Sequence, residues 1–337
     1  MGTVIPLKKE IDNSYLRLKN LIGNKLDEVS QRIKFKLASE INLIHKMTEY
    51  HTKSGGKRIR PLLTLASAKM CGYKNGNRDI NLAACIELIH NATLLHDDVI
   101  DNSDLRRGNK TANSIWGNQS SILVGDYLFS RCFEMMVEDG SQEILKLLSS
   151  TSSKIAQGEV LQLEHKGDIE LIEETYFNII NMKTATLFAA ATRVGACLGN
   201  KNRKEKDALE SYGKNLGLAF QIADDALDYF STKKVFGKEI GKDFYEGKTT
   251  MPLIIIFQRA NLEEKNFLKE IFKKKKRNED DFSETLALIN KYKALQESFK
   301  RAEHFVNVSY NSLGLFHHSE EKKVLQNLTE FSLNRSY

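Results

Sequence analysis

The chain has 337 residues, of which 41% are hydrophobic and 28% are charged, and its formal net charge is +6. These values are ordinary for a soluble globular protein. No stretch reaches the roughly 18 uncharged apolar residues that a membrane-spanning helix requires, and the N-terminus has no apolar segment of the kind found in signal peptides. We therefore expect a soluble protein without a transmembrane segment.

Neither the charges nor the cysteines indicate a nucleic-acid or zinc site. The densest basic run, residues 273–277, is followed at once by Glu279, Asp280 and Asp281, which is typical of a solvated loop. A nucleic-acid binder would gather its lysines into a stripe beside aromatic residues, so no nucleic acid is expected as a partner. The four cysteines lie far apart without a CxxC pair, which disfavours disulfides and favours the reducing cytoplasm.

Helical spacing dominates the chain, and its three prolines favour long uninterrupted helices. Apolar residues recur every three or four positions in residues 80–95, and a turn with a helix cap at residues 139–141 precedes "QEILKLL". Residues 168–199 repeat the helical pattern and end in small side chains, which predicts an interior helix. "PLIIIF", residues 252–257, fits a buried helix better than a strand. We expect one all-α domain over residues 1–337.

Two acidic motifs, "DDVID" and "DDALD", have the same spacing, and each follows an apolar helical run. Their carboxylates are Asp97, Asp98 and Asp101 in the first motif and Asp224, Asp225 and Asp228 in the second. Carboxylates four residues apart share one face of a helix and repel each other. A divalent cation resolves this conflict, because Mg²⁺ binds carboxylate oxygens and keeps positions open for phosphate oxygens. Two facing helices with Mg²⁺ between them would suit a diphosphate.

Cationic residues beside glycines support an anionic ligand. "SGGKRIRP" presents bases after two glycines, and glycine lets the backbone approach a ligand closely. The bases we single out are Lys57, Arg58 and Arg60 there, Arg106 and Arg107 in "DLRRG", Lys183 in "MKTATLF", and Lys238, Lys242 and Lys248 in "FGKEIGKDFYEGKTTMP". An unpaired ammonium would be costly at Lys183, which lies in an otherwise apolar helix. The GxxxxGK[ST] spacing of a nucleotide-binding P-loop is absent before Lys248.

Seven motifs, in order from about residue 55 to residue 252, resemble those of the trans-polyprenyl diphosphate synthase (E-isoprenyl synthase) family. They are "GGKRIRP", "HNATLLHDDVID", "RRG", "GDYLFSR", "KTATLF", "FQIADDALD" and "GKDFYEGKTTMP". The resemblance implies an all-α helical bundle around a deep apolar cavity, assembled as a homodimer. One departure is the string Asn109-Lys110-Thr111, where the family often has Lys-Pro-Thr after the arginines; this affects the local loop and not the expected ligands.

The resemblance also implies roles for particular residues. The expected ligands of about three Mg²⁺ ions are Asp97, Asp98, Asp101, Asp224 and Asp228, with Asp225 and Lys183 also catalytic. The expected contacts of the allylic diphosphate are Arg106, Lys183, Gln221 and Lys238, with Thr184 and Lys248 as further substrate contacts. The expected contacts of isopentenyl diphosphate are Lys57, Arg60, His90 and Arg107. Without the family, His90 would be interpreted as a core histidine on an apolar helix.

The implied reaction joins isopentenyl diphosphate to an allylic prenyl diphosphate. Mg²⁺ and the cations stabilise the departing diphosphate, so that the allylic C–O bond ionises. The double bond of isopentenyl diphosphate then attacks the carbocation, and a proton is lost to the released diphosphate without a side-chain base. An apolar pocket keeps water away from the cation.

Product length is expected to depend on Ala92 and Thr93, about one turn before Asp97. Short-chain family members carry a bulky aromatic at one of these positions, whereas both residues are small here. We expect an open tunnel, with its floor near Leu147 and Leu148, and an octaprenyl-type product for a quinone side chain. Alternatively, Ala92 only packs against a neighbouring helix. Product release could involve peripheral contact with a membrane.

Three other functions remain open from the sequence. A geranylgeranyl or farnesyl diphosphate synthase would share every motif and differ in product length. A class I terpene cyclase shares the fold and the first acidic motif but needs no second diphosphate site. A non-catalytic regulatory subunit of a heteromeric synthase could lose its acidic motifs, yet both are complete here.

Overall fold

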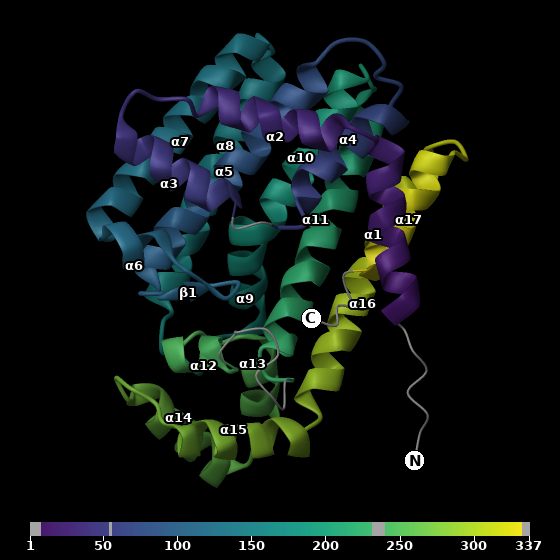
Figure 1. The fold of residues 1–337 in the computed structure, drawn as a ribbon. Helices are drawn as coiled ribbons and strands as arrows, with labels where there is room; N and C mark the ends of the chain where they lie inside the picture. The colour runs from purple at the N-terminus through teal and green to yellow at the C-terminus, as the bar shows by residue number, and fades with distance from the viewer. Residues whose placement is uncertain (1–7, 54–55, 231–239, 332–337) are drawn as a thin grey trace.

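The computed structural model describes residues 8–53, 56–230 and 240–331, and most of these residues are helical (Figure 1). The first group of helices is α1 (Lys8–Ile22), α2 (Lys25–Lys36), α3 (Asn42–Lys53), α4 (Ile59–Met70), α5 (Arg78–Ile100), α6 (Ala112–Trp116), α7 (Asn118–Asp139) and α8 (Gln142–Glu164). The second group is α9 (Glu173–Ile180), the π-helix η1 (Asn181–Ala185), α10 (Thr186–Leu198), α11 (Arg203–Leu227), α12 (Lys242–Glu246), α13 (Met251–Arg259), α14 (Leu262–Lys273), α15 (Glu279–Lys291), α16 (Ala294–Ser312), the 3₁₀-helix η2 (Leu313–Leu315) and α17 (Glu320–Phe331).

The prediction of an all-α fold is confirmed, with one short hairpin that the sequence did not indicate. Strands β1 (Leu105–Arg106) and β2 (Asn109–Lys110) pair antiparallel. Arg107 and Gly108 form the turn between them with φ values of 52° and 78°. Positive φ at both central residues is the geometry of a tight two-residue hairpin. Strands of two residues are too short to produce an alternating pattern.

Local predictions hold at two helices and fail at one loop residue. The Ser141 side chain accepts a hydrogen bond from the Ile144 N–H and caps α8, and "PLIIIF" lies in α13. The basic run after α14 is exposed from Lys273 to Lys276, as expected for a solvated loop. Arg277 is the exception, because its guanidinium lies 4.5 Å from the centre of the Phe272 ring. Stacking on the aromatic face removes this arginine from bulk water.

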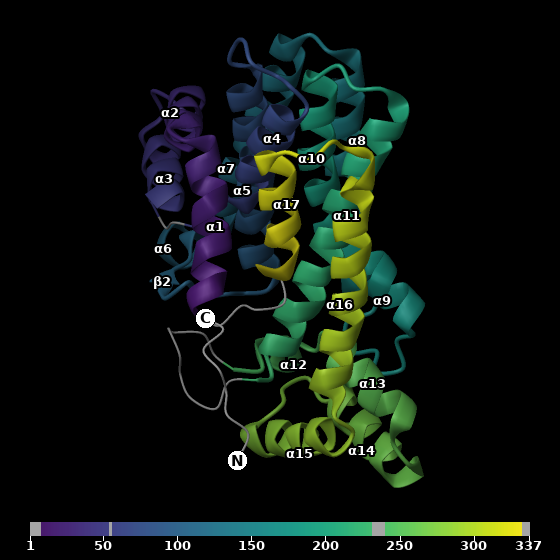
Figure 2. The same cartoon turned by 90° about the vertical axis from the view of Figure 1, so that its right-hand side faces the viewer.

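The helices bury two apolar clusters, one toward each end of the molecule. The first is built mainly on α4, α5, α7 and α10, and the second on α9, α11, α13 and α16. The long helix α11 belongs to both and packs along α10 and α16 (Figure 2). Because α11 spans both clusters, it fixes the position of the second acidic motif relative to α5.

Two further arrangements bear on function. Helix α1 packs against α17, so the two terminal helices of the described chain lie side by side. Helices α12 to α15 occupy the end of the molecule below the acidic motifs (Figure 1). Among the helices of the described residues, none combines the length and apolarity that crossing a lipid bilayer requires. The single-domain boundary at 1–337 stays a prediction.

Candidate active site

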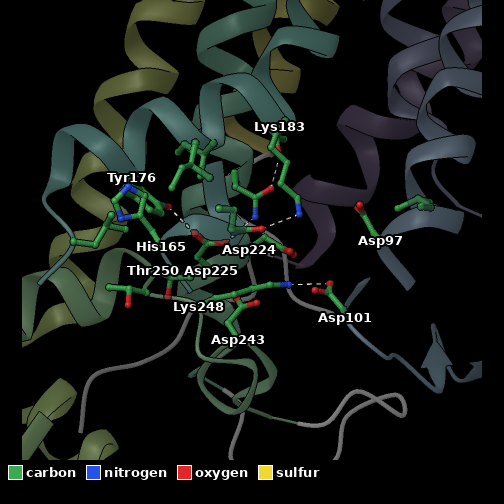
Figure 3. Close-up of a pocket in the computed structure, with 18 of the residues that line it drawn as sticks. Asp97, Asp101, His165, Tyr176, Lys183, Asp224, Asp225, Asp243, Lys248 and Thr250 are labelled. Atoms are coloured by element: carbon green, nitrogen blue, oxygen red, sulfur yellow. Dashed lines mark hydrogen bonds and ion pairs between the residues drawn. The ribbon is translucent and has the colours of Figure 1, made fainter. Parts of the chain in front are cut away.

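The two acidic motifs meet at one cavity of about 210 Å³, although 127 residues separate them in sequence. It lies between the C-terminal end of α5, helix α8, η1, α11 and the segment that begins with α12. The predicted site residues that line it are Asp97, Asp101, Arg106, Lys183, Thr184, Gln221, Asp224, Asp225 and Lys248. Asp97 and Asp101 lie on one side and Asp224 and Asp225 on the other, with lysines between them (Figure 3).

On the α5 side of the cavity, the pKa values of Asp97 and Asp101 shift in opposite directions. Burial raises the pKa of Asp97, and the neighbouring Asp101 adds to this effect while Lys183 opposes it. Burial alone would also raise the pKa of Asp101, but the nearby lysines together lower it. The closest of them is Lys248, whose Nζ lies 2.9 Å from Asp101 Oδ2. The Lys248 ammonium therefore lies beside Asp101, one of the carboxylates that the sequence predicts to bind a metal ion.

Asp98 faces away from this cavity. Its carboxylate is buried and accepts a hydrogen bond of 2.8 Å from Arg106 Nε. Adjacent residues on a helix point about 100° apart, and here Asp97 lines this cavity while Asp98 lines the second pocket. Asp98 instead orients Arg106, which lines both this cavity and a second pocket. The prediction that Asp98 is a metal ligand stays untested.

The α11 wall is held in place by a chain of hydrogen bonds. Tyr176 donates its hydroxyl to one oxygen of Asp225 at 2.6 Å, and Gln221 Nε2 donates to the other at 2.7 Å. The Thr184 hydroxyl in turn donates to Gln221 Oε1 at 2.8 Å. Burial raises the pKa of Asp225 well above its ordinary value. With both oxygens engaged, Asp225 braces α11 against α9 and η1, and it lines the cavity together with Asp224.

Asp228, at the C-terminal end of α11, holds the backbone around Gly241 and Asp243 in place. Its Oδ2 accepts a hydrogen bond of 3.0 Å from the backbone N–H of Asp243, and its carbonyl accepts one of 3.0 Å from the Gly241 N–H. Asp228 does not line the cavity, whereas Asp243 does. The prediction that Asp228 is a metal ligand stays untested.

Lys183 enters the cavity from the π-helix η1. Its ammonium donates to Glu159 Oε2 at 2.7 Å and to Gln162 Oε1 at 3.0 Å, both on α8. Burial lowers the pKa of Lys183, but Asp97 and Glu159 together raise it above its ordinary value. Burial raises the pKa of Glu159 to about 7. Lys183 is therefore a buried, charged lysine whose partners the sequence does not reveal.

The π-helix is possible because two glycines lie against it. A Cβ on Gly158 of α8 would lie 2.7 Å from the backbone nitrogen of Lys183, and a Cβ on Gly217 of α11 would lie 2.6 Å from Ala185 Cα. Both distances are shorter than any side chain tolerates, so α8 and α11 enclose η1 at backbone contact. Single π-turns inside α-helices occur often at functional sites. The prediction that residues 168–199 are helical and end in an interior segment is confirmed, because most of α10 is buried; the π-turn between α9 and α10 was not predicted.

Several residues at the site were not singled out from the sequence as site residues. Among them, Asp243, His165 and Tyr176 line the cavity, and Glu159 contacts Lys183, which lines it. Asp243 is buried, burial raises its pKa, and its carbonyl accepts the Lys248 N–H at 2.8 Å. Its position within "GKDFYEGK" was the available signal. Glu159 supports Lys183, and His165 pairs with Asp168 through Nδ1 and Oδ2 at 3.2 Å.

A smaller pocket adjoins the cavity on the other side of Arg106. Its predicted site residues are His90, Asp98, Arg106 and Arg107, and Glu87, His51 and Asn91 also line it. Burial lowers the pKa of His90 well below its ordinary value, and the surrounding arginines lower it further. His90 is therefore a neutral imidazole beside a cationic wall. Leu94 lines both spaces, so the two are separated by little more than this leucine and Arg106.

The remaining predicted residues lie elsewhere. Lys57 is exposed, and Arg60 stacks on Phe188 with its guanidinium carbon 4.5 Å from the ring centre; neither lines the two spaces. Lys238 lies outside the described residues. Ala92 is fully buried, and neither it nor Thr93 lines the cavity, whereas Leu94 does. The tunnel prediction therefore stays a prediction.

The donor set fits a divalent cation that arrives with an anionic substrate. Across the described ranges, no three His, Cys, Asp or Glu side chains are grouped closely enough to hold a metal ion by themselves. Mg²⁺ typically uses one or two carboxylates and completes its octahedron with water and phosphate oxygens. Asp97, Asp101 and Asp224 offer such carboxylates on both sides of the cavity.

Comparisons with known proteins agree with this geometry. Residues 41–289 match the family model described as polyprenyl synthetase. The chain is 35% identical over 331 residues to octaprenyl diphosphate synthase of Haemophilus influenzae, covering 98% of this chain and 100% of that one. It is 31% identical over 299 residues to geranylgeranyl diphosphate synthase of Methanosarcina mazei, covering 87% and 90%.

The crystal structure of a polyprenyl synthase from Caulobacter crescentus, complexed with calcium and isoprenyl diphosphate, superposes with a TM-score of 0.91. It is 40% identical, and the match covers 95% of this chain and 98% of that one. The fold and the facing acidic motifs define an all-α isoprenyl diphosphate synthase. The chain belongs to the polyprenyl synthetase family and is a prenyltransferase, similar among others to octaprenyl diphosphate synthases.

Proposed function

We propose that this enzyme extends an allylic prenyl diphosphate with isopentenyl diphosphate, using Mg²⁺, to a long all-trans polyprenyl diphosphate of octaprenyl length. The observation that carries the proposal is the pairing of two anion sites. One is the cavity between the acidic walls, and the other is the smaller cationic pocket. Arg106 belongs to both, which suits a reaction that joins two diphosphates.

In this proposal the larger cavity holds the allylic diphosphate. Lys183 and Lys248 line it as partly buried ammoniums, and both have a raised pKa because of the surrounding carboxylates. Asp97, Asp101 and Asp224 would hold Mg²⁺ on that diphosphate. When bound, the ion would supply Lewis-acid stabilisation of the departing oxygen. Thr184 and Gln221 would contact the diphosphate from η1 and α11.

The smaller pocket would hold isopentenyl diphosphate. Arg106 and Arg107 supply guanidiniums that bind phosphate oxygens in a bidentate manner. A neutral His90 would donate or accept a single hydrogen bond without adding charge. Leu94 lies between this pocket and the cavity, so the double bond of the second substrate would approach the allylic carbon across an apolar contact.

The side chains then perform three tasks. Lys183, Lys248 and Arg106 donate hydrogen bonds to the diphosphate as negative charge develops on it, which lowers the barrier to ionisation. Leu94, Ile179 and Ile180 line the cavity and would exclude water from the carbocation. The proton lost after coupling would pass to the released diphosphate, so no carboxylate or imidazole has to act as a base.

Two observations support a product of octaprenyl length. Ala92 and Thr93 carry no aromatic side chain that would stop a growing chain beside α5, and the Haemophilus influenzae relative is named for an octaprenyl product. Each isoprene unit buried in an apolar tunnel would gain about 4 kcal/mol at roughly 0.8 kcal/mol per methylene. The enzyme would act in the cytoplasm. Its product would become the side chain of a quinone and would be delivered through peripheral contact of the enzyme with a membrane. The alternative, a shorter product, is supported by the similarity to the Methanosarcina mazei relative, which is named for a geranylgeranyl product.

The homodimer is supported by an apolar stripe on the solvent side of α7. Leu123, Phe133 and Val137 lie on the face opposite the core and are 46–68% exposed. Val160 and Leu163 on α8 extend the set of exposed apolar side chains. These apolar side chains alternate with exposed Asp126 and Ser130 on the same face of α7, a mixture of apolar and polar groups that suits a protein–protein interface. A second copy of the chain would cover it by two-fold symmetry.

The reaction is tested by replacing one carboxylate in each acidic wall. Asp97→Asn and Asp224→Asn should each lower kcat roughly 100-fold or more, because the metal–diphosphate cluster loses a ligand. The assay contains Mg²⁺, farnesyl diphosphate and labelled isopentenyl diphosphate, and Asp280→Asn on exposed α15 serves as the matched control. Near-normal turnover of both variants at saturating Mg²⁺ would contradict the assigned metal site. Absence of turnover in the wild type would favour a regulatory subunit.

Chain length is tested by adding an aromatic ring below the first acidic motif. Ala92→Phe and Thr93→Phe should shorten the product while the first condensation continues, because the ring blocks the path of the growing chain. Products are sized by chromatography, and melting temperatures confirm that the variants are folded. Two folded variants with unchanged product lengths would place the tunnel elsewhere.

The dimer is tested by introducing charge into the apolar stripe. Leu123→Glu together with Val137→Glu should reduce the mass measured by sedimentation equilibrium from twice 38.4 kDa to 38.4 kDa, because two carboxylates would be buried at the interface. Leu262→Glu, at a residue that is 75% exposed on α14, is the control. A wild-type protein that sediments as a monomer would exclude the homodimer.

A further inference from the structure

Two helices that precede the residues matched by the family model hold the basic loop at residues 56–58. The family match begins at residue 41, whereas α1 and α2 lie entirely before it. Tyr15 of α1 donates its hydroxyl to the carbonyl oxygen of Lys57 at 3.0 Å. Arg58 Nη1 donates to the hydroxyl of Ser30 on α2, and that hydroxyl donates to the Leu26 carbonyl at 2.9 Å. One residue of the loop is thus fixed by α1 and the next by α2.

The backbone of this loop needs such support. Arg58 has φ 46° and ψ 44°, a left-handed conformation that non-glycine residues adopt at an energetic cost. Strained residues persist where surrounding contacts determine their conformation. The bond to Ser30 holds the side chain of Arg58, and the bond from Tyr15 holds the preceding carbonyl.

The loop also touches the smaller pocket. Gly56 has φ 150°, and a Cβ at this position would lie 2.7 Å from Arg107 Nη1. The loop backbone therefore lies against the guanidinium of a pocket residue. Arg58, Arg60 and Arg107 all act on the buried Glu87, which lines the pocket. A shift of the loop would move this group of guanidiniums relative to the pocket.

We propose that Tyr15 and Ser30 are positioning residues for isopentenyl diphosphate. By fixing the loop at residues 56–58, they set the place of Lys57 and of the arginines beside the smaller pocket. The inference rests on the proposed function, because it assigns the smaller pocket to that substrate. It extends the site to α1 and α2. Neither Tyr15 nor Ser30 lines the larger cavity, so the allylic substrate should be insensitive to them.

The test separates the two substrates. Tyr15→Phe and Ser30→Ala should each raise KM for isopentenyl diphosphate about three- to tenfold, the loss expected for one hydrogen bond. KM for farnesyl diphosphate and kcat should change less than twofold. Ser30→Thr keeps a hydroxyl and should restore KM for isopentenyl diphosphate to near the wild-type value. Tyr310→Phe, on an exposed part of α16, is the matched control.

Each outcome decides one question. If the wild type does not condense the two substrates, the proposed function fails and the inference fails with it. If the wild type is active and KM for isopentenyl diphosphate is unchanged in folded Tyr15→Phe and Ser30→Ala, the inference alone is wrong. An equal rise in both KM values would mean that α1 and α2 only stabilise the fold, which also overturns it. Melting temperatures verify that each variant is folded.

Discussion

The cavity depends on a charge imbalance that its own residues only partly relieve. Asp97, Asp101, Asp224, Asp225 and Asp243 all line one buried space, opposed by Lys183, Lys248 and Arg106. Burial raises the pKa of Asp97, Asp225 and Asp243 because desolvation disfavours their charged forms. Lys248 pairs with Asp101, and Lys183 pairs with Glu159. A diphosphate bound with divalent cations would bring negative charge to the lysines and Arg106, and positive charge to the carboxylates of this cavity.

The rest of the fold maintains that arrangement. Helix α11 spans both apolar clusters and carries the second acidic motif, while hydrogen bonds from Tyr176 and Gln221 fix Asp225. Gly158 and Gly217 let α8 and α11 close on the π-helix that presents Lys183. These contacts join four elements, namely α8, α9, η1 and α11. Each alone is a modest interaction, and together they hold Asp225 and Lys183 in place at the cavity.

Much of this could be predicted from the sequence, and the exceptions have physical reasons. Helical periodicity and the repeated acidic spacing predict that Asp97, Asp101 and Asp224 face one space, because spacing along a helix determines which residues share a face. The same spacing does not tell which way Asp98 and Asp228 turn, since that depends on Arg106 and on the N–H of Asp243. The partner of Lys183 is distant in sequence. The π-turn adds a fraction of a residue to a helical pattern, which periodicity cannot detect.

The contacts that the N-terminal helices make with the basic loop also could not be predicted from the sequence. The residues of "GGKRIRP" predict an anion site on their own, but their support from Tyr15 and Ser30 becomes visible only when α1 and α2 are folded against α4 and α5. Motifs identify the groups that carry charge. Long-range packing decides where each of those groups points.

The central claim is that divalent cations join the two acidic walls only together with a diphosphate. Titration calorimetry with a sulfur-bridged farnesyl diphosphate analogue, which ionises poorly, measures this directly. The account predicts that the analogue binds at least roughly tenfold more tightly with Mg²⁺ than in EDTA, because the carboxylates repel a bare diphosphate. Equal affinity under both conditions would contradict it.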